Sequence, residues 1–395
     1  MKILVVSSKY QPEYSGSGLR AHNTYKRFKE KYDVNFDILT NSLTHQGNKK
    51  YEFEGLEVTR ISPPFIIPKK KSILRLILMS LGLIWEVFYS WKFVKKKITE
   101  YDLLHTFGNT WTIGFLSWYF SKKNKPIIRE LCNDMSNPLY PIQAESYMKP
   151  VFNKKNTLVI PISKRLEKLA KNYELKNIWY RLNPVNENKF FIDYKNKYFL
   201  RSKLTKFNQN DIVLNLVANF VDRKNQLFSI DVLNFLPNNF KLILAGPLKT
   251  ENYEYFKLIQ KKIHNFGLTD RVDIQTGFID NFDEYLKCSD IFLFPSKAEG
   301  LGTPLLEAQA CGVPVISNYI SDITDTMIKE DNGGYFLELD AKKWAEAIQK
   351  VLKFPEQTLI DNANHVNKIC SSKNIDEEYY KKIKKLINNE YSDVK

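Results

Sequence analysis

The stretch of sequence that decides the fold reads PSKAEGLGTPLLEAQACGVPVIS and runs from Pro295 to Ser317. It follows an apolar run at 291–294, which predicts a short buried strand, and it continues as a glycine-containing loop and then a helix. Thr303 is a favourable N-cap and Pro304 suits the first helical position, so we expect the helix to begin there. A helix N-terminus carries unpaired N–H groups and a partial positive charge, which favour phosphate.

Two glutamates, Glu299 and Glu307, lie on either side of this predicted helix N-terminus. Carboxylates repel phosphate, so we expect them to bind neutral groups such as sugar or ribose hydroxyls. Gly300 and Gly302 allow the backbone to approach a ligand closely. An isolated pair of glutamates at this spacing more often has no binding role and consists of ordinary carboxylates in a loop and a helix. The strand, the glycines, the capped helix and both acids together instead indicate a site for a ligand with phosphate and hydroxyl groups.

Length and charge narrow the class of protein. A chain of 395 residues with 43% hydrophobic residues predicts two globular domains. Residues 1–200 hold 34 Lys and Arg against 17 Asp and Glu, a net charge of +17, whereas the rest of the chain carries −2. This asymmetry favours a basic face toward an anionic partner, either nucleic acid or a membrane surface. Four scattered cysteines and a short first apolar run predict a reducing, cytoplasmic location without a signal peptide.

Short apolar runs alternate with helical patterns in two series, which predicts two parallel α/β sheets. The expected strands are 3–7, 34–39, 58–61, 103–106, 127–131 and 158–162, followed by 212–217, 241–245, 272–275, 291–294 and 313–317. We expect one domain at 1–195 and a second at 196–372. A C-terminal segment at 373–395 is expected to be helical and to pack back on the first domain.

Polar and small residues follow several of these strands. Ligands of open α/β sheets bind beyond the carboxyl ends of the strands, so these residues are candidates for a site. They are Gly16, Gly18, His105, the loop at 132–134, Lys224 and Glu299.

The order of these segments resembles the retaining glycosyltransferases of family four, whose GT-B fold has two Rossmann-like parallel-sheet domains facing across a cleft. The resemblance covers nearly the whole chain and includes KILVVSSKYQPEYSGSGLRAH (2–22), YDLLH (101–105), RLNPVNENKFF (181–191), LVANFVDRKNQ (216–226) and the stretch at 295–317. It implies transfer of a sugar from a nucleotide diphospho-sugar to an acceptor hydroxyl, with retention of the anomeric configuration.

The resemblance also implies roles for individual residues. Lys224 and Arg223 are expected to stabilise the diphosphate leaving group, together with backbone N–H groups of the loop at 301–303. Glu307 is expected to hold the ribose hydroxyls. Glu299 is expected to hold the donor sugar and to favour positive charge at the anomeric carbon. Further donor contacts are expected from Gly16, Gly18, Phe278, Gly300, Leu301, Gly302 and Thr303. The chain has no D-x-D motif, so neither a metal nor another cofactor is expected.

The chain departs from the family pattern in the phosphate-binding segment. Asn219 stands where the family has an arginine, five residues before Lys224. Arg223 is the alternative source of positive charge. Ser321 and Asp322 replace glycines that usually follow the strand at 313–317.

A second departure concerns the histidine that contacts the donor sugar in the family. The corresponding segment here reads RELCND, at 129–134. Asp134 is its best replacement as a catalytic residue, because a carboxylate accepts hydrogen bonds from hydroxyls, and Cys132 and Asn133 are alternatives. His105 is the nearest histidine, and a structural role at a strand end is an equally good interpretation of it.

Residues 69–97 raise the question of a membrane. Lysine triplets flank about twenty mostly apolar residues, the length of a spanning helix, but Arg75 and Glu86 interrupt them. On a helix, the polar and small residues fall on a narrow stripe: Ser72, Arg75, Met79, Gly82, Glu86 and Ser90. Two interpretations stay open, a helix packed largely in the first-domain core and a helix lying in an anionic membrane surface. A spanning helix is the least favoured.

The leading hypothesis is a metal-independent retaining glycosyltransferase that acts on a glycan or lipid-linked acceptor in cell-surface polysaccharide, lipopolysaccharide or glycolipid synthesis. It would be cytoplasmic or bound to the inner face of the plasma membrane. The alternatives are a nucleotide-sugar epimerase or hydrolase of the same architecture, and a non-catalytic membrane-binding or nucleic-acid-binding module. The aromatic residues lie mostly within apolar runs, so no nucleic acid partner is expected.

Overall fold

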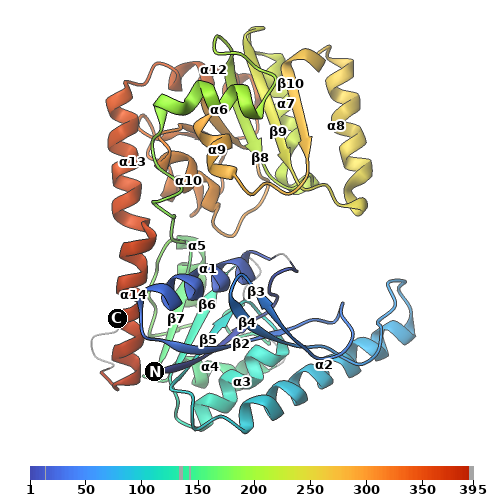
Figure 1. Ribbon diagram of the computed structural model, residues 1–395, viewed down its shortest axis with the longest axis vertical. Helices are drawn as coiled ribbons and strands as arrows, with labels where there is room; N and C mark the ends of the chain where they lie inside the picture. The colour runs from blue at the N-terminus through green and yellow to red at the C-terminus, as the bar shows by residue number, and fades with distance from the viewer. Residues whose placement is uncertain (14, 133–136, 142–143, 391–395) are drawn as a thin grey trace. The chain divides into compact units, whose positions relative to one another are not determined.

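The computed structural model describes residues 1–13, 15–132, 137–141 and 144–390. The chain forms two compact units, Met1–Arg181 together with Asp376–Lys395, and Leu182–Ile375 (Figure 1). The chain therefore passes from the first unit to the second at residue 181, earlier than the boundary at 195 that the sequence indicated.

The first unit is built on a sheet of seven strands within the described ranges, in the order β3-β4-β2-β1-β5-β6-β7. The strands are β1 (Lys2–Ser7), β2 (Asn35–Asn41), β3 (Lys49–Phe53), β4 (Leu56–Ile61), β5 (Leu103–Phe107), β6 (Ile127–Leu131) and β7 (Thr157–Pro161). Neighbouring strands are parallel, except that β3 runs antiparallel to β4 at the sheet edge. Strands β5, β6 and β7 are buried along their whole length, as expected for parallel strands covered on both faces.

Helices connect these strands and cover the sheet (Figure 1). They are α1 (Gly16–Lys31), α2 (Ile73–Lys95), α3 (Trp111–Lys122), α4 (Glu145–Phe152) and α5 (Lys164–Asn172). Four of them begin at a hydroxyl residue whose side chain accepts a hydrogen bond from a backbone N–H of the first turn, the usual N-cap arrangement: Ser15, Ser72, Thr110 and Ser163.

The C-terminal helix α14 (Ser372–Ile387) contributes to the core of the first unit. Tyr379, Ile383 and Leu386 are buried in the same hydrophobic cluster as residues of β1 and α1. Arg27 of α1 donates to the Asp376 carboxylate, with Nε and Oδ2 2.6 Å apart. The last helix thus completes a core that the N-terminal part of the chain begins.

The second unit is described throughout and holds a parallel sheet of six strands, in the order β10-β9-β8-β11-β12-β13. The strands are β8 (Ile212–Val217), β9 (Phe240–Gly246), β10 (Val272–Thr276), β11 (Ile291–Phe294), β12 (Val315–Asn318) and β13 (Gly334–Leu337). The helices are α6 (Lys197–Leu204), α7 (Gln226–Asn234), α8 (Tyr253–Asn265), α9 (Phe282–Lys287), α10 (Thr303–Ala310), α11 (Thr324–Met327), α12 (Ala341–Val351) and α13 (Glu356–Cys370). Two parallel sheets confirm the predicted α/β class.

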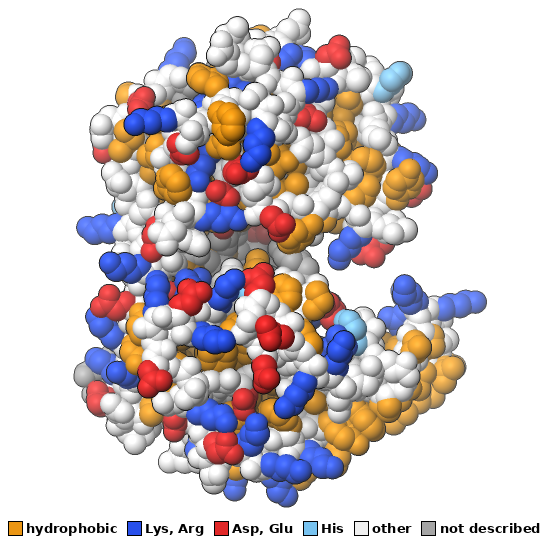
Figure 2. Space-filling model, viewed as in Figure 1, with side chains coloured by type: hydrophobic (Ala, Val, Ile, Leu, Met, Phe, Trp, Pro, Cys, Tyr) orange, Lys and Arg blue, Asp and Glu red, His pale blue; other side chains and the backbone are white. Residues whose placement is uncertain are grey.

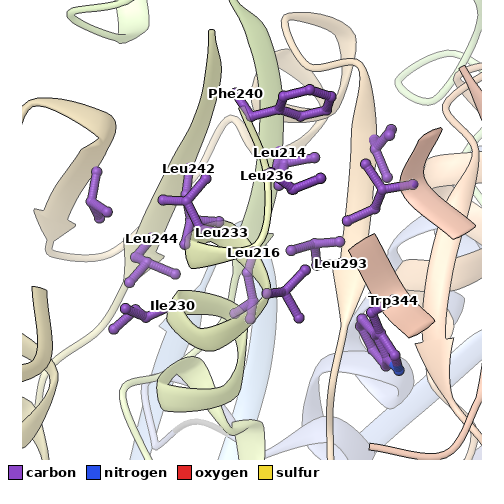
Figure 3. Packing of buried hydrophobic residues seen from close by; sticks show 14 of the residues in the cluster. Leu214, Leu216, Ile230, Leu233, Leu236, Phe240, Leu242, Leu244, Leu293 and Trp344 are labelled. Atoms are coloured by element: carbon purple, nitrogen blue, oxygen red, sulfur yellow. The ribbon is translucent and has the colours of Figure 1, made fainter. Parts of the chain in front are cut away.

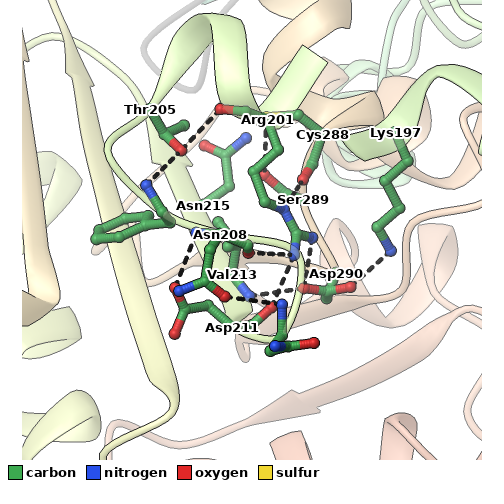
Figure 4. Close-up of polar contacts among 12 residues, drawn as sticks. Lys197, Arg201, Thr205, Asn208, Asp211, Val213, Asn215, Cys288, Ser289 and Asp290 are labelled. Atoms are coloured by element: carbon green, nitrogen blue, oxygen red, sulfur yellow. Dashed lines mark hydrogen bonds and ion pairs between the residues drawn. The ribbon is translucent and has the colours of Figure 1, made fainter. Parts of the chain in front are cut away.

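Leucine-rich strands and helices form the main core of the second unit (Figure 3). Strands β8 and β9 supply alternate leucines, α7 supplies Ile230 and Leu233, and α12 supplies Trp344, which is fully buried. A buried polar cluster around Arg201 lies at the amino-terminal edge of the same sheet (Figure 4). Arg201 donates to the Cys288 carbonyl and to Asp290, both at 2.9 Å, which ties α6 to the sheet. The core and this cluster together fix the helices to the sheet.

The helix α2 has an unusual exposure. Among the described residues, it is the one helix long and apolar enough to cross a membrane by length and composition, yet only 17% of its most apolar window is buried. The interpretation of the segment at 69–97 as a helix packed largely in the first-domain core is therefore wrong. The narrow polar stripe, rather than the apolar surface, faces the protein: Gly82, Glu86 and Ser90 are buried.

Candidate active site

The carboxyl ends of the strands in the second unit carry most of the predicted donor-binding residues. The loops there are 218–225 after β8, 247–249 after β9, 277–281 after β10 and 295–302 after β11. The carboxyl ends of parallel strands lie at one edge of the sheet, which is where open α/β folds bind ligands. The structure thus brings together residues that are far apart in the sequence, such as Lys224 and Glu299, which are 75 positions apart.

The helix α10 begins one residue earlier than the sequence indicated. Its N-cap is Gly302, which has φ 89°, a left-handed conformation that favours glycine. Thr303 is the first helical residue, and its hydroxyl accepts a hydrogen bond from the Asn183 side chain at 2.8 Å rather than capping the helix. Gly302 has no side chain to cap α10. Pro304 has no N–H group, and the Leu305 N–H donates to the Gly302 carbonyl at 2.9 Å, so the Thr303 N–H is the donor of this turn that a ligand can use.

Two cations and one carboxylate meet beside this helix. Glu299 Oε1 lies 2.5 Å from Lys224 Nζ and 2.9 Å from Arg223 Nη1. Lys224 and Glu299 are largely buried, whereas the Arg223 side chain is about half exposed. Burial raises the pKa of Glu299, but the positive charges of Lys224 and Arg223 outweigh it and leave the pKa below its ordinary value. The carboxylate is therefore ionised at neutral pH and holds both cations together.

A short 3-10 turn, η3 (Asp222–Lys224), presents these cations. Asn225 follows it with φ 57°, and Arg223 Nη1 also donates to the Ala298 carbonyl at 2.6 Å. Asn219 lies earlier in the same loop, where its backbone carbonyl accepts from the Gln226 side chain at 2.9 Å. Positive charge beside Glu299 thus comes from Arg223, in the absence of an arginine at position 219.

Glu307 lies within α10 and is partly buried. Burial raises the pKa of its carboxyl to about 7, with Lys189 opposing and Asp283 reinforcing the shift. The two glutamates of the motif therefore differ in acidity, because Glu299 has cations within hydrogen-bond distance and Glu307 does not gain enough positive charge to offset burial.

A hollow of about 320 Å³ lies at the carboxyl ends of β9 and β10. Its lining consists of Pro247, Leu248, Thr276, Gly277 and Phe278. The ring of Phe278 is 71% exposed, which is unusual for so large an apolar side chain. An exposed aromatic ring beside an apolar wall is suited to stacking on a planar base.

The two glycines after β1 differ in what surrounds them. A Cβ atom on Gly18 would lie 2.4 Å from the Lys9 carbonyl oxygen, so packing requires a glycine there. A Cβ atom on Gly16 would meet nothing within 4 Å. Packing within the first unit therefore explains why a glycine stands at position 18. It does not explain Gly16, for which the close approach of a ligand stays a prediction.

The catalytic assignment of His105 is corrected by the structure. The ring is fully buried, with Nδ1 2.8 Å from the Tyr25 hydroxyl and Nε2 2.5 Å from the Tyr379 hydroxyl. Burial lowers the pKa of His105, which keeps the ring neutral. Both nitrogens are used within the protein, so His105 has a structural role.

The same buried cluster contains a carboxylate that the sequence did not single out. Glu130 Oε1 accepts from Arg181 Nη2 and from the Tyr379 hydroxyl, each at 2.6 Å. Arg20 lies 3.4 Å from the other carboxylate oxygen. Asp134 and Asn133 lie outside the described residues, and Cys132 is partly buried with a thiol pKa raised by burial.

Among the described residues, no set of three or more His, Cys, Asp or Glu side chains is placed to hold a metal ion. The charged groups that the sequence motif brings together are instead Lys224, Arg223 and Glu299. Asn183 and Lys189 were missed as neighbours of the site, although both lie in the RLNPVNENKFF segment that pointed to the fold.

Two Rossmann-like units with such a site define the GT-B class of fold, and comparison with known proteins agrees. Residues 196–366, most of the second unit, match the family described as "Glycosyl transferases group 1". The chain is similar in fold to HepE of Anabaena, crystallised in complex with UDP, with a TM-score of 0.74 at 17% identity over 97% of this chain and 100% of HepE.

Curated relatives match over a shorter span. The "Capsular polysaccharide biosynthesis glycosyltransferase CapH" of Staphylococcus aureus is 29% identical over 170 residues, 42% of this chain and 47% of CapH. The "UDP-Gal:alpha-D-GlcNAc-diphosphoundecaprenol alpha-1,3-galactosyltransferase" of Escherichia coli is 26% identical over 191 residues, 46% of each chain. The chain thus spans about half the length of these relatives. The substrates in their names are those of the relatives.

Proposed function

We propose that this protein is a retaining glycosyltransferase that moves a sugar from a nucleotide diphospho-sugar to an acceptor hydroxyl without a metal ion. The observation that carries the proposal is the convergence of Lys224 and Arg223 on Glu299, at 2.5 and 2.9 Å, near the N-terminus of α10. The match of residues 196–366 to group 1 glycosyl transferases supports it, as do the UDP complex of HepE and the role of CapH in capsular polysaccharide biosynthesis.

The leaving diphosphate requires stabilisation of its developing charge. Lys224 and Arg223 would turn from Glu299 toward the phosphate oxygens, which form stronger charge-assisted hydrogen bonds than neutral acceptors do. The uncapped N–H groups at Leu301, Gly302 and Thr303 would add the partial positive charge of the helix end.

The transfer itself balances without a separate general base. The bond between the anomeric carbon and the phosphate oxygen breaks, and the acceptor oxygen forms the new bond on the same face. The departing phosphate oxygen takes the acceptor's proton. In the proposal, Glu299 holds sugar hydroxyls and favours positive charge at the anomeric carbon, Glu307 binds the ribose hydroxyls, and Phe278 stacks on the base.

We further propose that the acceptor is a glycan or a lipid-linked glycan of a cell-surface polysaccharide, lipopolysaccharide or glycolipid, reached at the cytoplasmic face of the membrane. The capsular polysaccharide function in the name of CapH and the diphosphoundecaprenol-linked acceptor of the galactosyltransferase support this choice. No nucleic acid partner is proposed.

A thermal-shift panel of UDP-, GDP-, ADP- and dTDP-sugars with EDTA present tests donor binding. A ligand at a hundred times its Kd adds about 2.7 kcal/mol to the free energy of unfolding, so the true donor class should raise the Tm clearly. If none does, the proposal fails. Products formed with and without an acceptor extract then separate transfer from epimerisation or hydrolysis, because a transferase releases nucleoside diphosphate at a rate that depends on acceptor.

A further inference from the structure

The outer face of α2 carries apolar side chains, while its inner face carries small and polar ones. The exposed large side chains are Ile73, Leu74, Leu76, Ile77, Leu81, Ile84 and Phe88, each between 49% and 78% exposed. The buried residues are Gly82, Glu86, Ser90 and Val94. Figure 2 shows the hydrophobic side chains gathered along this helix. A surface helix of a soluble protein has the opposite arrangement, so this face needs a cover other than water.

Contacts on the inner face fix which side of α2 faces outward. A Cβ atom on Gly82 would lie 2.8 Å from the Leu43 side chain, and Ser90 Oγ accepts from the Asn41 amide at 3.2 Å. Glu86 is 3% exposed, and burial raises its pKa to about 8, with Glu13 adding to the shift. The carboxyl group is mainly protonated at neutral pH and brings little charge to the helix. The apolar residues at 73, 77, 81, 84 and 88 lie on the opposite, outward side of the helix.

Positive charge borders this outward side at both ends. Lys69, Lys70 and Lys71 are exposed immediately before the helix, and Lys95 and Lys96 are exposed at its end. Blue side chains flank the orange stripe in Figure 2. Apolar side chains with lysines beside them match a bilayer surface, where acyl chains take up the apolar groups and anionic headgroups attract the lysines.

We propose that α2 docks this protein on an anionic lipid bilayer, lying in the plane of the interface with the stripe from Ile73 to Phe88 facing the acyl chains. The charge distribution favours lipid over a protein partner, because residues 1–200 carry +17. The helix does not span the bilayer, since its inner face is held against the first unit through Gly82, Glu86 and Ser90.

The place of α2 in the first unit adds a consequence for the substrate. Gly82 lies against Leu43, Pro63 and Ile67, in the loops that follow the carboxyl ends of β2 and β4. Ile66 in the same loop is 73% exposed. The docked bilayer therefore lies next to the carboxyl edge of the first sheet. Resting on the proposed function, this placement assigns the acceptor to the class anchored in the membrane by a lipid.

Sedimentation with vesicles tests the docking. The full chain is mixed with vesicles of phosphatidylcholine, or of phosphatidylcholine and phosphatidylglycerol in equal parts. Three variants are compared: Ile77→Ser/Ile84→Ser/Phe88→Ser, the five exposed lysines at 69–71, 95 and 96 changed to Gln, and a control, Phe235→Ser/Tyr253→Ser/Leu258→Ser. The control removes side chains of similar exposure, 50–55%, from the second unit. Hydrogen exchange at 73–90 is followed with and without vesicles.

We expect the protein and its control to bind the anionic vesicles, with slower exchange at 73–90. The α2 triple variant should bind at least about tenfold more weakly, and the lysine variant about tenfold more weakly on anionic vesicles. Unchanged binding by the triple variant overturns the proposal, as does resistance to alkaline extraction, which indicates a spanning helix. A dimer that dissociates in the triple variant, without vesicle binding, also overturns it.

The failure of this proposal is distinguishable from failure of the proposed function. Nucleotide-sugar binding measured in solution should be the same in the α2 variant and the wild type. Loss of nucleotide binding by the wild type would remove the proposed function and leave the vesicle result standing.

Discussion

At the scale of single residues, the site separates two glutamates by acidity. Glu299 shares one oxygen with Lys224 and Arg223, and these charges keep its pKa below the ordinary value against the effect of burial. Glu307 is raised to about 7 by burial. An ionised Glu299 holds the Lys224 and Arg223 cations in place, whereas Glu307 gains full charge only above neutral pH.

Nucleotide affinity should therefore depend on Glu307 and on pH. The ionised carboxylate of Glu307 can accept hydrogen bonds from both ribose hydroxyls. In the protonated acid, one oxygen carries a proton and acts as a donor instead. UDP binding should therefore tighten as the pH rises through about 7. Glu307→Gln should weaken binding by about 1–3 kcal/mol at high pH. Calorimetric titration across this range measures both effects. The nucleotide's own phosphate titrates nearby, so the test is the difference between the two proteins, and parallel pH profiles would contradict the assignment.

The glycines after β1 should respond differently to alanine. Gly18→Ala places a Cβ atom 2.4 Å from a backbone oxygen and should lower the free energy of unfolding by about 1–3 kcal/mol. Gly16→Ala meets open space and should leave stability within about 0.5 kcal/mol while lowering turnover of the donor. Chemical denaturation and donor turnover are the two measurements. Full turnover by the Gly16 variant would show that this glycine does not face the ligand.

At the scale of elements, α14 is held in the first unit by a buried polar contact. The Tyr379 hydroxyl lies 2.6 Å from Glu130 and 2.5 Å from His105, and these partners come from two neighbouring strands. A hydrogen bond to a buried carboxylate is stronger than one between neutral groups, so this tyrosine anchors the helix to the sheet.

Removal of that hydroxyl should loosen α14. Tyr379→Phe leaves Glu130 and His105 with one partner fewer and should cost about 1–3 kcal/mol, seen as faster amide exchange in residues 376–387. Tyr380→Phe is the control, because this ring stacks on Tyr32 at 4.1 Å and its hydroxyl is not part of the cluster. Equal protection of α14 in the two variants would mean that apolar packing alone holds the helix.

Sequence periodicity predicts every described strand except one edge strand of each sheet. The eleven expected strands are present, because fully buried strands read as apolar runs. Strands β3 and β13 were missed: β3 begins with two exposed lysines and β13 is a short edge strand. The predicted start of α10 differs from the observed start by one residue, because the sequence does not reveal the left-handed conformation of Gly302.

At the scale of the whole molecule, the sequence predicts those parts of the site whose residues lie close together in the chain. The motif at 295–317 indicated Glu299, Glu307 and the helix, because these residues are close in sequence. The sequence left a structural and a catalytic role for His105 equally open, since the bonding partner Tyr379 comes from 274 positions later. Charge asymmetry indicated an anionic partner, but only the structure shows that the apolar side of α2 faces outward.

The two units carry different features of the molecule. The second unit holds the cations, the glutamates and the aromatic hollow of the proposed nucleotide site. The first unit holds the excess positive charge and the exposed apolar helix. Donor binding and membrane docking are therefore separable properties of the chain, and each can be measured without the other.

The central claim is that Lys224, Arg223 and the N-terminus of α10 bind a nucleoside diphosphate without a metal ion. The most direct test is calorimetric titration of the wild-type protein with UDP, GDP, ADP and dTDP in EDTA, repeated with magnesium. We predict that at least one diphosphate binds equally well in both buffers, and that Lys224→Gln weakens it by about tenfold or more. Binding that appears only with magnesium, or none at all, would contradict the account.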